Sequence, residues 1–262
     1  MDADNAGKAM NKFINTSFSR VLVISFLLVL FWWLIVAVTQ VPSFILPSPE
    51  KVFTRFWQLT DVLYPHFLVT LIEIVFGVLL GVSAGLIFAI LMVYFKPVRI
   101  WLLPVLLFSQ AIPVFAIAPI LVLWFGYGIV SKVIMAAVII FFPILMTSFD
   151  GLRQSSKDYL ELAQSMQANR LSILFRIQLP AALPVMASGL RMAMVVAPIG
   201  AIIGEWVGSS QGLGYFMLYA NARMQVADMF AALFVLCLLS ISLYYLADQC
   251  LKKLIFWQQD NS

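Results

Sequence analysis

Residues 158–184 read DYLELAQSMQANRLSILFRIQLPAALP, and this stretch decides how the rest of the chain is interpreted. It is a polar segment inside a chain that is otherwise strongly apolar, and Pro180 follows its last charged residue. Its apolar residues recur at the spacing of one helix face, namely Tyr159, Leu162, Ala163 and Met166. The pattern predicts a short amphipathic helix, and the surrounding sequence must explain what that helix contacts.

The composition of the whole chain is that of a membrane protein. Of the 262 residues, 63% are hydrophobic and 11% are charged, whereas soluble domains carry about 25% charged residues. Apolar runs of about 18 or more residues recur, long enough to cross a bilayer as helices. We therefore expect an all-α, polytopic protein surrounded by lipid. The net charge is +4, but the basic residues are scattered rather than clustered, which argues against nucleic acid as a partner.

Six apolar segments are long enough to span a membrane, at residues 21–41, 66–94, 98–125, 129–149, 184–207 and 228–250. The first exceeds the about 7–15 apolar residues of a signal peptide, so we expect it to be retained as a span. Three prolines predict a bend or break in the third segment: Pro104, Pro113 and Pro119. The expected organisation is an N-terminal segment, 1–20, followed by a single transmembrane domain, 21–262.

Lysine and arginine are distributed unevenly between the two sides of these spans. With the N-terminus inside, eleven basic residues fall on the cytoplasmic side and four on the opposite side. Because cytoplasmic loops carry the excess of basic residues in multi-pass proteins, both termini are predicted to be cytoplasmic. The same orientation places residues 150–183, between the fourth and fifth spans, in the cytoplasm; we call them the 150–183 loop.

The 150–183 loop is expected to form two short helices. Asp158 is a candidate cap for the first, with Glu161 three residues on, as in a capping box. Asn169 suits the turn between the helices, because Asn tolerates left-handed backbone geometry, and Pro180 is expected to stop or kink the second helix. Periodicity alone leaves two interpretations open: a rigid element that docks on another protein, or an amphipathic segment lying on the lipid headgroups.

The loop resembles one signature of the permease subunits of ATP-binding-cassette (ABC) importers. That "EAA" signature is Glu-Ala-Ala, three residues, Gly, nine residues and Ile-x-Leu-Pro. This sequence keeps the spacing, with Leu162 in place of the first Ala and Gln167 in place of the Gly. The resemblance implies the type I ABC importer permease fold and a loop that couples to a separate ATPase. The coupling residues it implies are Glu161, Leu162, Ala163, Gln167, Ile177, Leu179 and Pro180.

Other segments resemble one branch of this family. Residues 46–49 (LPSP) with Val52, and residues 204–215 (GEWVGSSQGLGY), are similar to permeases for nitrate, aliphatic sulfonates, taurine and thiamine precursors. Residues 217–225 (MLYANARMQ) are similar to permeases for hydroxymethylpyrimidine-type thiamine precursors. The resemblance implies a bacterial cytoplasmic (inner) membrane location, an extracytoplasmic substrate-binding protein and a homodimer of the permease.

The chain contains no GxxxxGK[ST] phosphate-binding loop. We therefore expect no catalytic residue, metal or cofactor on this chain, with ATP and Mg²⁺ bound by a dimer of partner ATPase subunits. A secondary transporter or channel independent of ATP would show inverted repeats or paired charges at mid-membrane, and an intramembrane enzyme would need a nucleophile with a base or a metal cluster. Neither pattern is evident in the sequence.

Ionisable groups inside spans are candidates for function because they are costly to insert. Glu205, with Trp206 beside it, is interpreted either as a residue of the translocation path or as an interfacial carboxylate that caps the following loop. Glu73 has the same two interpretations, and Asn221 and Arg223 are further path candidates.

Small residues in the second span, Gly77, Gly81 and Gly85, predict close helix packing, either within the chain or across a dimer.

Overall fold

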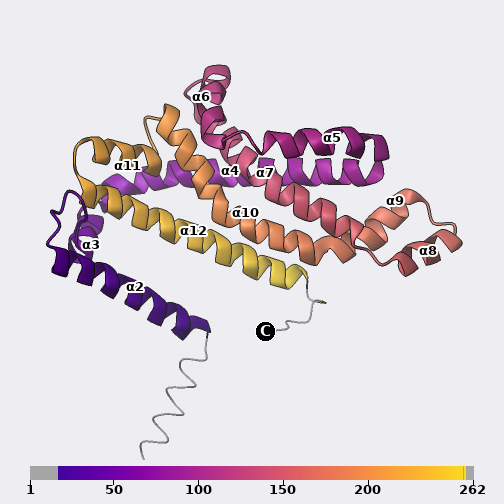
Figure 1. The fold of residues 1–262 in the computed structure, drawn as a ribbon, viewed down its shortest axis with the longest axis horizontal. Coiled ribbons are helices and arrows are strands. Elements are labelled where there is room, and N and C mark those ends of the chain that lie inside the picture. The colour runs from indigo at the N-terminus through magenta and orange to yellow at the C-terminus, as the bar shows by residue number, and fades with distance from the viewer. Residues whose placement is uncertain (1–16, 256, 258–262) are drawn as a thin grey trace, which may run out of the picture. The chain divides into compact units, whose positions relative to one another are not determined.

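The computed structural model describes residues 17–255 and 257, which form helices joined by short connections (Figure 1). The N-terminal prediction for residues 1–20 therefore lies mostly outside the described residues. The helices are α2 Ser17–Thr39, α3 Pro49–Gln58, α4 Thr60–Tyr94, α5 Lys96–Ser109, α6 Val114–Phe125, α7 Ile129–Arg153, α8 Lys157–Ser165, α9 Arg170–Ile173, the π-helix η1 Leu174–Gln178, α10 Leu179–Gly208, α11 Leu213–Ala222 and α12 Val226–Leu254.

Most of the predicted spans coincide with long apolar helices. Within the described residues, α4, α7, the continuous helix Arg170–Gly208 and α12 are each long and apolar enough to cross a membrane. The pair α5 and α6 forms a further candidate span that is bent by 102° between its two helices. The first predicted span falls on α2, whose apolar part Val23–Thr39 is shorter. The multi-pass, all-helical fold class is confirmed, whereas the number of six spans is not reproduced in full.

The bend between α5 and α6 has its cause in the proline pattern of the third span. Pro113 precedes the first residue of α6 and has an extended backbone, so it separates the two helices. Pro104 and Pro119 lie inside α5 and α6 respectively, without ending either helix. Of the three prolines, only Pro113 breaks the span.

The structure divides into two units, each described by itself. One comprises the described residues up to Thr60 together with Ala220–Ala231, and the other comprises Asp61–Tyr219 and Ala232 onward. In the first unit, Arg55 of α3 forms a two-pronged ion pair with Asp228, with Nε to Oδ1 at 2.5 Å and Nη2 to Oδ2 at 2.8 Å. This hydrogen bonding raises the pKa of Arg55 and fixes α3 against the beginning of α12.

The core of the second unit is built on small residues that let helices approach closely. A Cβ added at Gly77 would lie 2.5 Å from the Cβ of Ala136, and one at Gly200 would lie 2.6 Å from the Cα of the same residue. The stripe predicted on the second span therefore packs α4 against α7 within the chain, and α10 packs on α7 in the same way. Larger buried side chains such as Ile74 and Ile140 fill the remaining space.

Candidate functional sites

The first helix of the 150–183 loop ends in a Schellman motif centred on Gln167. The amide of Ala168 donates to the carbonyl of Ala163 at 2.9 Å, and the amide of Gln167 donates to that of Gln164 at 2.9 Å. Gln167 itself has φ +59°, in the left-handed region that favours glycine. The bend that the family signature makes with Gly is thus kept at the same position by a glutamine, and not moved to Asn169.

Asn169 has a different role from the one expected. Its side-chain Oδ1 accepts a hydrogen bond from the amide of Ser172 at 2.7 Å, so it caps the next helix. The expected cap by Asp158 is wrong as well. The N-cap of α8 is Ser156, without a side-chain cap bond, and Asp158 lies in the first helical turn, where its charge favours the helix dipole.

Pro180 does not stop the second helix. The chain runs helically from Arg170 to Gly208, and residues Leu174–Gln178 adopt the wider π-helical pattern just before the proline. The amide of Leu179 donates to the carbonyl of Leu174, five residues back. This wider turn accommodates a residue that has no N–H to donate. The loop is therefore rigidly continuous with α10, the fifth predicted span.

The apolar stripe of α8 divides between two environments. Ala163 is buried against its own chain, whereas Tyr159, Leu162 and Met166 are 65%, 59% and 75% exposed. Glu161 is exposed beside them, and Ile177, Leu179 and Pro180 are half-buried. Figure 1 shows α8 and α9 at one end of the second unit, with the beginning of α11 at the other end. Among the residues that the structure describes, this exposed face of α8 has no partner.

Four polar side chains form a second candidate site, the buried carboxylate cluster: Thr70, Glu73, Lys132 and Glu205, each at most 3% exposed. At its centre, Glu205 of α10 accepts hydrogen bonds from the Thr70 hydroxyl at 2.6 Å and from the amides of Gly214 and Tyr215 at 2.5 and 3.2 Å. The carboxylate therefore satisfies the free amides at the beginning of α11 and ties α11 to α4 and α10.

Glu73 and Lys132 complete the cluster from α4 and α7. The Glu73 carboxyl group lies within hydrogen-bonding reach of Glu205, while its Oε2 has no hydrogen-bond partner. The Lys132 ammonium donates to the carbonyls of Tyr127 and Gly128 at 2.7 and 2.9 Å and attracts both carboxylates. Buried charges persist only when they are paired and hydrogen-bonded, so this cluster holds four helices in one arrangement.

Gly212 is required by the geometry of this cluster. Its φ is +108°, and a Cβ added there would lie 2.2 Å from the Cδ of Glu205. The amide of Gly212 donates to Nδ1 of His66 at 3.0 Å, and the next amide, of Leu213, donates to the Thr70 hydroxyl oxygen at 2.8 Å. Side chains of α4 and α10 thus hold the whole entry into α11.

The structure brings two of the predicted path residues together. Glu73 and Glu205 meet in the buried carboxylate cluster, while Trp206 is 42% exposed. Asn221 and Arg223 belong to the other unit and are exposed at the surface of the chain. Glu205 has the geometry of the loop-capping interpretation, and its role in a translocation path stays a prediction.

Sequence reasoning missed two members of the cluster and its glycine. Thr70 carries no signal in an apolar helix, and Gly212 is one of several glycines in its segment. Lys132 could have been found, because it is a charged residue inside the predicted span 129–149. Among the described residues, no three His, Cys, Asp or Glu side chains are grouped closely enough to hold a metal ion.

Comparison with known proteins identifies the class. The family described as "binding-protein-dependent transport system inner membrane component" matches residues 77–255. A probable ABC transporter permease protein from Haemophilus influenzae is 49% identical over 229 residues, which are 87% of this chain and 94% of the relative. The formylaminopyrimidine transport permease protein ThiX from Halalkalibacterium halodurans is 38% identical, over 82% of this chain and 87% of the relative.

The fold agrees with this result. This chain superposes on a chain of the MetNI methionine ABC transporter, in a structure described as inward facing, with a TM-score of 0.57. The two chains are 18% identical, and the superposition covers 75% of this chain and 96% of the MetNI chain. Relatives named for riboflavin, aliphatic sulfonate and taurine transport match the sequence as well.

The chain is a multi-pass membrane protein of the type I ABC importer permease fold. It belongs to the family of binding-protein-dependent transport system inner membrane components, in the branch that includes permeases named for formylaminopyrimidine, aliphatic sulfonates and taurine. Membership implies a separate ATPase and a substrate-binding protein as partners, and the chain itself is a permease subunit and not an enzyme.

Proposed function

We propose that the chain forms, as a homodimer in the bacterial cytoplasmic membrane, the translocation path for a thiamine pyrimidine precursor of the hydroxymethylpyrimidine type. Two observations support this substrate: residues 217–225 resemble such permeases, and the formylaminopyrimidine permease is 38% identical over 82% of the chain. The riboflavin permease is as similar, 38% identical over 88% of the chain, so riboflavin is an alternative substrate. An extracytoplasmic binding protein delivers the solute, and both termini of the permease are cytoplasmic.

Nitrate, aliphatic sulfonates and taurine are the alternative substrates for the same machinery, because relatives named for sulfonates and taurine match at lower identity. The binding protein decides between these classes, since it selects the solute. A small uncharged heteroaromatic ring and a sulfonate anion require different recognition chemistry, so they can be separated by direct binding.

The 150–183 loop is proposed to transmit the motion of the ATPase. Its α8 presents Tyr159, Leu162 and Met166 to a partner, and its second half is continuous with α10 through the π-helical turn. ATP and Mg²⁺ bind between the two ATPase subunits, and their closure displaces α8. Because the second half of the loop continues without interruption into α10, that displacement reaches the spans and not only the loop.

Uptake in reconstituted vesicles tests the function. The permease, its ATPase and its binding protein are incorporated with ATP inside, and radiolabelled hydroxymethylpyrimidine, taurine and nitrate are offered outside. We expect ATP-dependent uptake of the pyrimidine alone. Uptake driven by an ion gradient without the ATPase would refute an ABC permease, and uptake of taurine or nitrate instead would refute the substrate.

A substitution tests the proposed role of the loop. Glu161→Arg reverses an exposed charge on α8 and is expected to reduce association with the ATPase about tenfold or more, measured by co-purification. Asp61→Arg is the matched control, since it makes the same change at an exposed carboxylate of α4. Unchanged association of Glu161→Arg would favour a loop that lies on the headgroups.

A further inference from the structure

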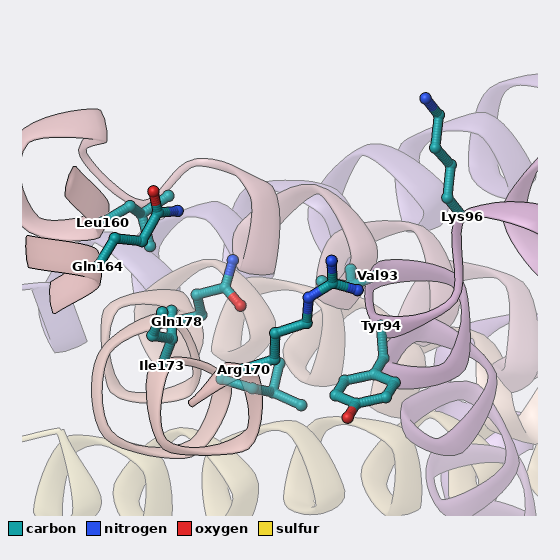
Figure 2. Close-up of a pocket in the computed structure, with 9 residues that line it drawn as sticks. Val93, Tyr94, Lys96, Leu160, Gln164, Arg170, Ile173 and Gln178 are labelled. Carbon is teal, nitrogen blue, oxygen red and sulfur yellow. The ribbon is translucent and has the colours of Figure 1, made fainter. Parts of the chain in front are cut away.

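A pocket of about 300 Å³ lies between the 150–183 loop and the ends of two spans (Figure 2). One wall consists of Val93 and Tyr94 at the end of α4 and Lys96 at the beginning of α5. The opposite wall includes Gln164 of α8 and Arg170 of α9. A ligand in this pocket would therefore contact both the loop and the spans.

The lining of this pocket is cationic. Its nine residues include Lys96 and Arg170 and no acidic residue. Within the part of the chain that the structure describes, neither of these two side chains has an ion-pair or hydrogen-bond partner. By contrast, Arg55 and Arg191 are both paired with aspartates. A pocket whose lining contains two cationic residues and no acidic residue attracts an anion.

The remaining polar groups of the lining supply hydrogen-bond donors. In Figure 2 the guanidinium of Arg170 extends between the amide of Gln178 and the end of α4, and the amide of Gln164 lies on the opposite side of the pocket. A guanidinium and two amides line the pocket, and the exposed Lys96 side chain, whose ammonium extends away from Arg170 in Figure 2, has a flexible stem that can turn the ammonium toward them. This arrangement suits a tetrahedral group with several acceptor oxygens better than a planar carboxylate.

We propose that this pocket binds a phosphate group and that the bound phosphate links α8 to the α4–α5 turn. The group is carried either by the headgroup of an anionic lipid or by a soluble phosphate. The position between the end of α4 and the beginning of α5 places the pocket at headgroup level. The cytoplasmic side of the membrane follows from the proposed function, on which this inference rests for its sidedness alone.

The consequence is a ligand-dependent stiffness of the loop. With the pocket empty, α8 is connected to the spans through α7, α9 and its buried Ala163. With a phosphate bound to Lys96 and Arg170 at once, the loop gains a second attachment to α4 and α5. We expect an anionic ligand to raise the thermal stability of the permease and to increase the coupling of ATP hydrolysis to transport.

A binding experiment tests the site on the permease purified with its ATPase. Thermal unfolding is followed during titration with dihexanoyl-phosphatidylglycerol, inorganic phosphate and, as a zwitterionic control, dihexanoyl-phosphatidylcholine at constant ionic strength. We expect a saturable rise in unfolding temperature with phosphatidylglycerol. The double variant Lys96→Gln/Arg170→Gln removes two charge-assisted contacts, each worth about tenfold, and should weaken that binding about a hundredfold.

Two further variants make the result decisive. Arg176→Gln/Lys253→Gln removes two exposed cations outside the pocket and should leave binding unchanged, while Lys96→Arg/Arg170→Lys should retain most of it. Saturation by inorganic phosphate with the same variant pattern would support the phosphate site and assign a soluble ligand. Equal loss in both double-Gln variants, or no saturable effect of phosphatidylglycerol or inorganic phosphate beyond that of the net-neutral phosphatidylcholine, would overturn the proposal. Because the readout is binding, a wild-type complex that fails to import the pyrimidine refutes the proposed function and not this site.

Discussion

The 150–183 loop and the buried carboxylate cluster lie at opposite ends of the second unit and use their carboxylates in opposite ways. Glu161 of the loop is exposed and has no partner among the described residues, whereas Glu205 of the cluster is 1% exposed and accepts three hydrogen bonds. The Glu161 carboxylate is available to contact another protein, whereas the Glu205 carboxylate stabilises the fold of its own chain.

This difference shows which functional residues can be recognised from the sequence and which only from the fold. A loop that docks on a partner keeps side chains exposed, and its function is recognised from the spacing of its signature residues in the sequence. A cluster that fixes four helices relies on groups far apart in sequence, such as Thr70, Lys132 and Glu205, which only the fold brings together. The sequence therefore marked Glu205 as a candidate, whereas its partners Thr70 and Lys132 were found only in the fold.

The largest expected loss of stability is that of Glu205→Leu, which is compared with the same exchange at Glu161 in the loop. Glu205→Leu leaves the Thr70 hydroxyl and two amides unpaired in a buried site, so we expect a loss of about 3 kcal/mol or more in the free energy of unfolding. The fluorescence of the seven tryptophans reports the unfolding temperature.

Glu161→Leu is the matched partner of that variant and should change stability by no more than about 0.5 kcal/mol, while it reduces ATPase association. Equal unfolding temperatures of the two variants would contradict the structural role assigned to Glu205.

Gly212→Ala tests the close packing of Gly212, just before α11, against Glu205. The new Cβ would collide with the Glu205 carboxyl group and place a side chain at φ +108°, so we expect a loss of about 2 kcal/mol. Gly128→Ala is the control, since no neighbouring atom lies within 4 Å of its added Cβ. Similar unfolding temperatures for both variants would contradict the close approach seen here.

Gln167→Gly tests the strained turn of the loop. Glycine adopts the left-handed conformation without steric cost, so we expect α8 to gain about 1 kcal/mol, seen as about fivefold slower hydrogen exchange of the amides in residues 157–168. Gln164→Gly, inside α8, should change the exchange in the opposite direction by a similar factor. Faster exchange in Gln167→Gly would mean that the glutamine side chain stabilises the turn.

The smallest effect is expected in the first unit, at the ion pair of Arg55 and Asp228. Arg55→Lys keeps the charge but loses the two-pronged geometry, and because Arg55 is 36% exposed on its side chain we expect a loss of about 0.5 kcal/mol. Arg176→Lys serves as the control at an exposed arginine. A loss as large as that of Glu205→Leu would place this pair among the buried structural contacts.

Much of the fold could be predicted from the sequence, because hydrophobic length alone sets a membrane span. The bent third span also followed from its prolines, although only Pro113 separates the two helices. The details of the 150–183 loop were predicted less well. Asp158 does not cap α8, and Asn169 caps α9 instead of making the turn between the two helices. Pro180 does not end the helix, because a π-helical turn precedes it. Capping and turn geometry depend on backbone angles that the side-chain pattern does not fix.

By itself the sequence determined the class of protein, most of its spans and the spacing of its loop signature, since each of these follows from the order of residues along one chain. Only the tertiary structure decided that Gly77 packs α4 inside the chain, that Gln167 keeps the bend, and that Glu205 meets Thr70 and Glu73. These are consequences of burial: in an apolar interior every charge needs a partner, and the partner is chosen by distance in space rather than along the chain.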